Sequence, residues 1–284
     1  MMGFAQAPGQ VTFAAIAPHG ALAISDSGRD QDEAQAPATQ RALLELQRRM
    51  PSSGAQSVVV FTPHNEHIEG HFAVIGSPRL KGDLADWAAP QIKLEATGDQ
   101  ELALGIQRAA QAKGLPLLRL TYAAETWPHP MDWGTLIPIW YLGARWEPPL
   151  PVAVISPSRD RTPDEHALLG EAVLEAIKES GKKVAVIASC DHGHGHQAEG
   201  PYGFREESAV FDRQIQEILR DDRMDKLIDF DPEFVKAAAA DSWWQMLILH
   251  GLLGKAWKPE LLSYEVPTYY GMMVAGFTSR ETSP

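Results

Sequence analysis

The sequence contains a single cysteine, Cys190, among 284 residues. One cysteine excludes an intramolecular disulfide framework and indicates a reducing compartment, so we expect a cytoplasmic protein. It also excludes cysteine-rich zinc sites and the zinc deaminase pattern, which needs a Cys-x-x-Cys pair. Any metal in this protein is therefore expected to use nitrogen and oxygen ligands.

Long hydrophobic runs and an excess of positive charge are also absent. Apolar stretches such as SVVVF and VAVIAS are far shorter than the roughly 20 residues that a membrane-spanning helix needs. The N-terminus lacks the basic and apolar pattern of a secretory signal. The formal charge of −12 argues against a nucleic-acid partner, because phosphate binding needs a basic face. We expect neither a membrane nor a nucleic acid as a partner.

Strand-like and helical patterns alternate along the chain, which predicts an α/β fold. We expect buried strands at 11–17, 57–62, 71–76, 115–120, 149–156 and 182–189, and a last extended segment at about 262–277. Helical patterns cover 38–50, 98–114, 162–181, 205–220 and 241–254, and 21–37 is predicted to be a surface loop. No linker-like stretch or repeat interrupts the pattern. The prediction is one layered α/β/α domain over residues 1–284, with a central mixed sheet and an active site at the strand carboxyl ends.

Histidines follow three of the predicted strands. VTFAAIAPHG supplies His19, SVVVFTPH supplies His64, and ASCDHGHGH supplies three alternating histidines at 192, 194 and 196. The prolines before His19 and His64 restrain the chain and help to direct each imidazole. Taken singly, such a histidine is typical of a surface loop or a core edge. Three strand-end positions in one chain favour a functional site.

A lone carboxylate, Glu265, lies near the C-terminus in LLSYEVPTYYG, between apolar neighbours. Burial of a carboxylate is costly unless a cation or a donor meets it. The alternative is an edge-strand glutamate that points outward. Two imidazoles and one carboxylate from distant loops are the ligand set of a ferrous site with open coordination positions.

The order of several motifs resembles the class III extradiol ring-cleavage dioxygenases. The motifs are APHG, the strand-ending TPH, SCDHGHGH followed by ESAVFDRQI, and SYEVPTYYG, and the resemblance runs from about residue 11 to 277. That family includes the catalytic subunit of protocatechuate 4,5-dioxygenase and the homoprotocatechuate and aminophenol enzymes. No single motif is decisive, but their order and spacing together are fairly specific.

The resemblance implies one mononuclear Fe(II), held by His19, His64 and Glu265, with zinc as an alternative occupant in purified protein. It implies an acid/base histidine, which the motif register assigns to His194. His192 and His196, two residues to either side, stay open as alternatives for this role, and otherwise they and Asp191 would line the site or support it.

One departure from the family concerns Trp133 in MDWGTLIPIWYL, because many members have a histidine there. The hydrogen bond of that histidine to substrate is then absent or is supplied by another group, for which His129 is the candidate. This departure bears on the identity of the substrate more than on metal binding.

The activity implied by the resemblance is an oxidoreductase that inserts both atoms of O2 into a catechol-type or 2-aminophenol-type ring. The family also implies a homo-oligomer, a dimer or larger, with a small partner subunit in some members. A non-catalytic binding module of the same superfamily and a zinc-dependent hydrolase are the alternatives, and Trp133 is the residue that keeps the first one open. The sequence does not specify the ring substituent or the oligomeric state.

Overall fold

The computed structural model describes residues 7–24, 35–124 and 127–282, and its core is an eight-stranded mixed sheet. The strands lie in the order β10-β11-β1-β9-β2-β8-β3-β6. In chain order they are β1 (Gln10–Ala17), β2 (Ser57–Phe61), β3 (Phe72–Ile75), β6 (Leu117–Leu120), β8 (Val152–Ser156), β9 (Lys183–Ser189), β10 (Trp257–Glu265) and β11 (Met272–Ser279). The central strands β1, β9, β2 and β8 are parallel, so their carboxyl ends meet at one edge.

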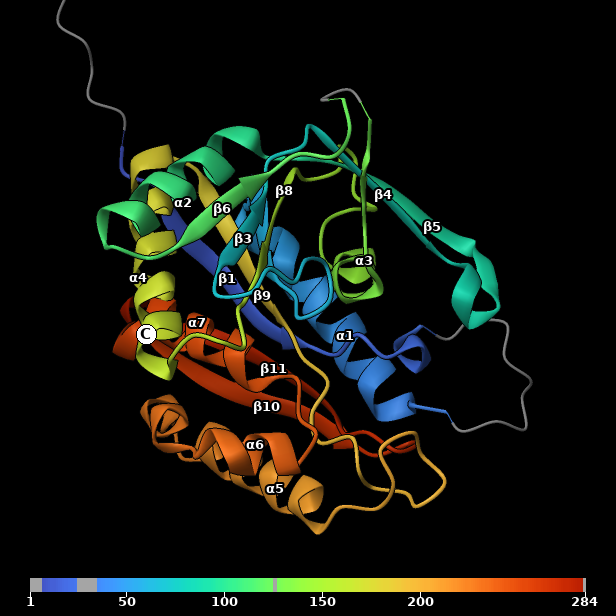
Figure 1. Cartoon of the computed structure of the whole chain (residues 1–284). Coiled ribbons are helices and arrows are strands. Elements are labelled where there is room, and N and C mark those ends of the chain that lie inside the picture. Colours follow the sequence, from blue (N-terminus) through green and yellow to red (C-terminus); the bar gives the residue numbers. More distant parts are fainter. Residues whose placement is uncertain (1–6, 25–34, 125–126, 283–284) are drawn as a thin grey trace, which may run out of the picture.

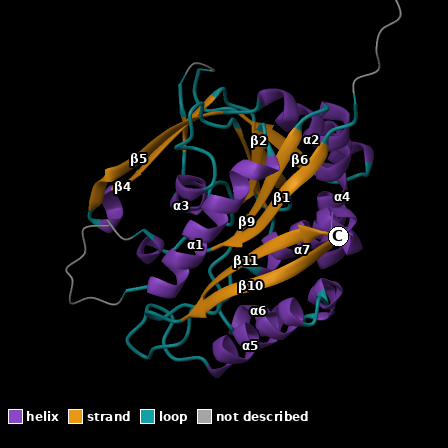
Figure 2. Cartoon of the chain, turned by 180° about the vertical axis from the view of Figure 1, so that it is seen from behind, coloured by secondary structure: helices purple, strands orange, loops and turns teal. Residues whose placement is uncertain are grey.

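Helices cover both faces of this sheet (Figure 1). One layer contains α2 (Gln100–Ala112), α4 (Pro163–Ser180) and α7 (Trp243–Leu253), and the other contains α1 (Pro37–Arg49) and α3 (Trp133–Tyr141). The helices α5 (Glu206–Arg220) and α6 (Pro232–Ala237) lie beside the β10–β11 hairpin (Figure 2). Strands between two helical layers are buried on both faces, which explains why β2, β8 and β9 are continuous apolar runs rather than alternating ones.

The predicted layered α/β fold with a mixed sheet is confirmed, and capping residues mark the beginnings of α2 and α4. Asp99 accepts a hydrogen bond from the Leu102 N–H at 3.1 Å at the start of α2. At the start of α4, Thr162 and Glu165 form a reciprocal capping box, and Gly181 ends the helix in the left-handed conformation with φ 67°.

Three features differ from the sequence-based expectation. The last extended segment is two antiparallel strands, β10 and β11, joined by a turn at 266–271. A three-stranded sheet of β4 (Arg79–Leu84), β5 (Ala89–Thr97) and β7 (His129–Pro130) was not predicted, and its β4–β5 arm extends away from the main body (Figure 1). Helix α3 was also missed, because its internal Pro138 is atypical of a helix. Residues 25–34 of the expected loop lie outside the described residues.

None of the helices in the described ranges is long and apolar enough to cross a membrane.

One buried histidine, His166, is expected to make the stability of the fold sensitive to acid. His166 in α4 is fully buried against Phe72, and burial lowers its pKa from 6.5 to about 4. The folded protein then holds a neutral imidazole that the unfolded chain protonates below about pH 6.5, so the free energy of unfolding falls as the pH drops from about 6.5 to 4. The expected loss from this group is about 3 kcal/mol. Urea unfolding of wild type and His166→Gln across this range checks it; equal pH slopes in the two proteins would contradict it.

Candidate metal centre

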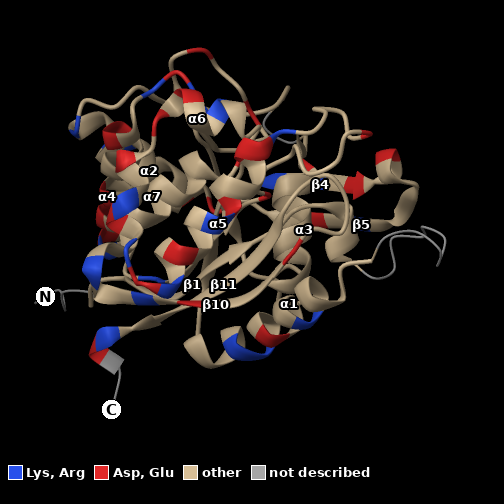
Figure 3. Ribbon diagram, turned by 90° about the horizontal axis from the view of Figure 1, so that it is seen from below, with Lys and Arg blue, Asp and Glu red and all other residues tan. Residues whose placement is uncertain are grey.

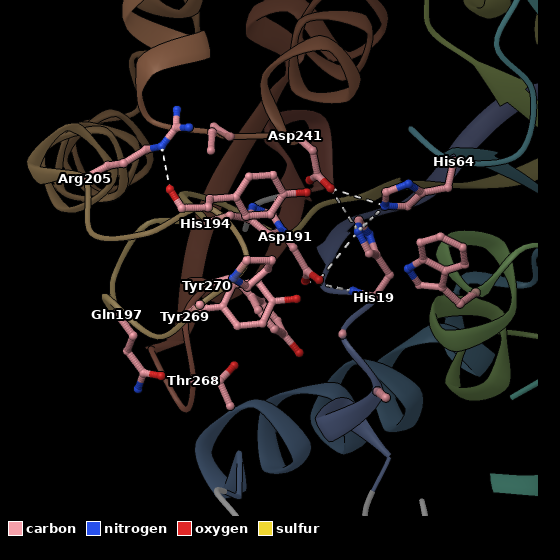
Figure 4. Close-up of a pocket in the computed structure, with 18 of the residues that line it drawn as sticks. His19, His64, Asp191, His194, Gln197, Arg205, Asp241, Thr268, Tyr269 and Tyr270 are labelled. Carbon is pink, nitrogen blue, oxygen red and sulfur yellow. Dashed lines mark hydrogen bonds and ion pairs between the residues drawn. The ribbon is translucent and has the colours of Figure 1, made fainter. Parts of the chain in front are cut away.

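The carboxyl ends of β1, β2 and β9 bring together residues that lie far apart in the sequence. His19 follows β1 by two residues, His64 follows β2 by three, and Asp191 follows β9 by two. Because β9 lies between β1 and β2 in a parallel arrangement, these three residues emerge at the same edge of the sheet. Asp241, just before α7, points toward His19 and His64 at the same place (Figure 4).

His19, His64 and Asp241 form a compact cluster in which one ligand atom of each lies within 4.8 Å of the others. The two imidazole Nε2 atoms are 3.1 Å apart. The Oδ2 atom of Asp241 is 3.3 Å from the Nε2 of His19 and 3.3 Å from the Nε2 of His64. Two nitrogens and one carboxylate oxygen that face a common point fit a divalent metal that accepts nitrogen and oxygen ligands.

A hydrogen-bond relay sets the orientation of the His19 ring. Ser189 Oγ donates to the Gly134 carbonyl at 2.5 Å, so it meets the His19 Nδ1 at 2.9 Å as an acceptor. Nδ1 therefore carries a hydrogen, and the Nε2 atom is the one directed at the cluster. A hydrogen bond at the ring nitrogen that does not bind the metal is typical of histidine ligands in metal sites.

His64 is held from a different side. Its ring stacks on Trp133, with ring centroids 4.3 Å apart and an interplanar angle of 28°. The preceding loop is anchored by Asp132, which caps α3 and accepts a hydrogen bond from the Thr62 hydroxyl at 2.8 Å. A Cβ at Gly134 would lie 2.4 Å from Thr62 Oγ1, so only glycine allows α3 to approach this loop so closely.

The imidazoles and carboxylates of the cluster shift one another's pKa. Burial alone would lower the pKa of His19, but the carboxylates of Asp191 and Asp241 outweigh it and raise that pKa to about 9. Burial would likewise raise the pKa of Asp241, yet His19 and His64 hold it well below its ordinary value. Asp241 Oδ1 is buried and has no hydrogen-bond partner among the described residues. A buried carboxylate with a spare oxygen beside two imidazoles fits a cation-binding role.

Glu265 does not join His19 and His64, contrary to the predicted ligand set. Its Oε1 accepts a hydrogen bond from the Thr39 N–H at 2.6 Å, in the first turn of α1. The first N–H groups of a helix have no partner within the helix, and a carboxylate there also meets the positive end of the helix dipole. This donor explains why a half-buried glutamate is tolerated between apolar neighbours. The carboxylate in the cluster is Asp241 instead.

Nothing in the local pattern singled out Asp241. The sequence predicts a helix over 241–254, and an acidic residue at a helix start is usually explained as a cap. In the structure α7 begins only at Trp243, and Asp241 is 7% exposed. The signal would have been an acid that precedes an almost fully apolar, buried helix, WWQMLILHGLL, where a solvated cap is not expected.

The three alternating histidines have separate surroundings. His192 is fully buried, with its Nδ1 3.0 Å from Ser242 Oγ, and burial lowers its pKa. His196 Nε2 lies 2.9 Å from Asp212 Oδ2. Only His194 of the three lines the cavity above the His19–His64–Asp241 cluster. Its ring stacks there on Tyr270, with ring centroids 5.4 Å apart.

Asp212 of α5 anchors the segment that carries these histidines. Besides His196 it accepts the Gly193 N–H at 2.8 Å and the Tyr264 hydroxyl at 2.8 Å. A Cβ at Gly193 would lie 2.7 Å from the Ser208 Cα, so glycine is needed for this close approach to α5. The anchored backbone explains how a glycine-rich segment holds His194 in a defined position.

The remaining predicted site residues divide between the cavity and its surroundings. Trp133 and Asp191 line the cavity, and Asp191 also accepts the His19 N–H at 3.0 Å. His129 does not line it; its Nε2 lies 2.8 Å from Glu66 Oε1. The expectation that His129 replaces the missing family histidine is therefore not supported by this geometry.

Comparison with known proteins gives matches over nearly the whole chain. Residues 13–277 match the family model described as the catalytic LigB subunit of aromatic ring-opening dioxygenase. The chain is 23% identical over 277 residues to Protein CA_C1420 of Clostridium acetobutylicum, but it spans only 58% of the length of that protein. It is 25% identical over 264 residues to the 2-aminophenol 1,6-dioxygenase beta subunit of a Pseudomonas species, covering 83% of this chain and 82% of that subunit.

A solved structure shares the fold. The uncharacterized protein JW3007 from Escherichia coli K12 superposes with a TM-score of 0.62 at 14% identity, covering 93% of this chain and 99% of that one.

Proposed function

Because the chain belongs to the family of catalytic LigB subunits of aromatic ring-opening dioxygenases, we propose that it is a ferrous extradiol dioxygenase. Its substrate class is an aromatic diol or a 2-aminophenol, opened with O2. The observation that carries the proposal is the convergence of His19, His64 and Asp241 at the bottom of an aromatic cavity. Residues 1–284 would form one catalytic domain, and the protein would act in the cytoplasm.

His19, His64 and Asp241 would hold the iron, with aspartate in place of the glutamate that the resemblance predicted. Bound by two histidines and one carboxylate, ferrous iron would supply the Lewis-acid and redox chemistry that ring opening with O2 needs. The Ser189 relay orients His19, and the Trp133 ring limits rotation of His64.

His194 is the proposed acid/base residue. Its Nδ1 is 2.6 Å from the His192 carbonyl, which can only accept, so Nδ1 carries a hydrogen. The Nε2 atom then has a lone pair available to take a proton from a substrate hydroxyl, and it can return that proton later in the reaction.

Aromatic side chains would hold the flat ring of the substrate. Trp87, Trp133, Tyr269 and Tyr270 line the cavity, and Trp87 packs on Trp133 with ring centroids 4.7 Å apart. These rings offer stacking surfaces and displace water from the diol. Trp87 belongs to the 3-10 turn between β4 and β5, so the tip of the protruding arm forms part of this wall.

The assembly is also part of the proposal. The Pseudomonas relative is named as a beta subunit. We therefore propose that this chain forms a homo-oligomer, with a small partner subunit as an additional component.

Oxygen uptake tests the function. The protein is purified without oxygen, loaded with Fe(II) or with Zn(II), and mixed with a panel of catechols and 2-aminophenols. Oxygen consumption that needs Fe(II), together with a new yellow absorbance, is the expected result. Zinc-dependent turnover without oxygen would instead support a hydrolase, and inactivity with every compound would support a non-catalytic binding module.

A further inference from the structure

We propose that the free edge of β10 binds an extended, acidic segment of a partner protein, which adds one strand to the main sheet. This interaction goes beyond the proposed ring cleavage and does not depend on it. A segment that adds to a sheet edge gains affinity from main-chain hydrogen bonds and specificity from pockets for its alternate side chains. The edge of β10 offers an unpaired backbone and a cavity on either face.

β10 is the last strand of the eight-stranded sheet and is paired on one side only, with β11. Its outer edge has no backbone partner among the described residues. Two features prevent this edge from pairing along its full length. Pro259 has no N–H to donate, and the register with β11 shifts between Leu261 and Ser263. The short run 260–265 therefore fits one short docked segment rather than an open-ended sheet.

A cavity lies on each face of the sheet beside this edge, because β10 packs between α5 and α1 (Figure 3). The α5-side cavity has a volume of about 750 Å³ and is lined by the consecutive strand residues 258–264. The α1-side cavity is smaller, about 250 Å³, and shares Leu262 and Ser263 with the first. Successive side chains of a strand point to opposite faces of a sheet. A segment paired with β10 would therefore place its side chains in the two cavities in turn.

Both cavities have apolar walls. The apolar lining side chains are Leu219, Leu261 and Tyr264 on the α5 side and Ala38, Ala42 and Leu262 on the α1 side. The larger cavity suits a side chain such as leucine or phenylalanine, and the smaller one suits valine or alanine. Ser263 lines both cavities, and its buried Oγ has no hydrogen-bond partner among the described residues. A polar group of a docked segment would satisfy this hydroxyl.

The charges at this edge favour an acidic partner. Three cations that line the cavities form no ion pair with a described residue, namely Arg41, Arg220 and Lys258. A fourth, Arg280, is paired with Asp222. The lining acids Glu45 and Glu260 are both paired with Arg49. The edge is thus positive within a chain whose formal charge is −12, so it attracts an acidic segment, whereas two copies of this acidic chain repel each other.

A peptide library tests the docking. Peptides of random sequence displayed on phage are selected on the immobilised full-length protein at low ionic strength. The selected peptides are expected to carry acidic residues around a core in which larger and smaller apolar side chains alternate. Enrichment of peptides without this pattern, or no enrichment at all, would overturn the proposal.

Backbone methylation of the strongest selected peptide tests the strand pairing. Every second residue of a paired strand directs its N–H and C=O to the same neighbouring strand. N-methylation of one alternate set of residues should therefore weaken binding by about 10-fold or more, because several hydrogen bonds are lost, and methylation of the other set should leave it unchanged. Hydrogen–deuterium exchange should slow at 260–265 when the unmodified peptide binds. Equal effects of the two methylated sets, or unchanged exchange at 260–265, would contradict strand addition.

Charge reversal separates this site from general attraction between opposite charges. Lys258→Glu should weaken the peptide by about 5-fold, the effect of losing one exposed ion pair. Lys93→Glu is the matched control and should leave the affinity unchanged, because Lys93 is an exposed lysine on β5, an edge strand of the small sheet, and lines neither cavity. Equal weakening in the two variants would reject the site.

The competing occupant is a second copy of this chain. Hydrogen–deuterium exchange without peptide, over a series of protein concentrations, distinguishes the two. Exchange at 260–265 is expected to be independent of protein concentration. Exchange that slows there as the concentration rises would assign the edge to a second copy and overturn the proposed partner.

Discussion

Asp241→Asn is expected to reduce the iron content from about one atom per chain to nearly none after dialysis, and ring cleavage should disappear with it. The substitution keeps the shape of the side chain but removes the negative charge that faces His19 and His64 at 3.3 Å. Without that charge the two imidazoles alone hold a divalent ion weakly. Metal analysis of the dialysed variant is the measurement, and circular dichroism verifies the fold.

Glu265→Gln is the matched control for this experiment. The amide oxygen can still accept the Thr39 N–H, so the variant should keep its iron and lose about 1 kcal/mol of unfolding free energy at most. Iron loss in Glu265→Gln with iron retained in Asp241→Asn would reverse the assignment and return the ligand role to Glu265.

His194→Phe is expected to keep its iron and to slow turnover by a factor of about 10² to 10⁴, the usual effect of removing one acid/base group. Phenylalanine preserves the ring that packs on Tyr270 but has no nitrogen to move a proton. Single-turnover kinetics at saturating substrate measure the loss directly, because they separate the chemical step from binding and release.

Two further histidine variants make this result specific. His67 is exposed and does not line the cavity, so His67→Phe should retain full activity. Unchanged turnover in His194→Phe would reject the role. A large loss in His196→Phe alone would instead favour that residue, although His196 is paired with Asp212.

Much of the fold was predictable because it depends on local patterns. Burial between two helical layers makes the central strands continuously apolar, and capping residues mark where helices begin. The sequence therefore indicated β1, β2, β8 and β9 and the limits of α4. The β10–β11 hairpin and the β4–β5 arm were harder to predict, because their pairing depends on contacts between segments rather than on a local period.

The same division applies to the candidate site. The sequence by itself determined that His19, His64 and the 192–196 segment lie at strand ends, because proline and the end of an apolar run act within a few residues. Only the tertiary structure decided which acid meets the two imidazoles. The role of a carboxylate depends on which groups lie within hydrogen-bonding distance of it. For Glu265 that group is the N-terminus of α1, and for Asp241 the groups are His19 and His64. Both neighbourhoods are made by residues more than a hundred positions away in the chain. The local sequence can therefore indicate a buried acid, as it does before α7, but not which partner that acid meets.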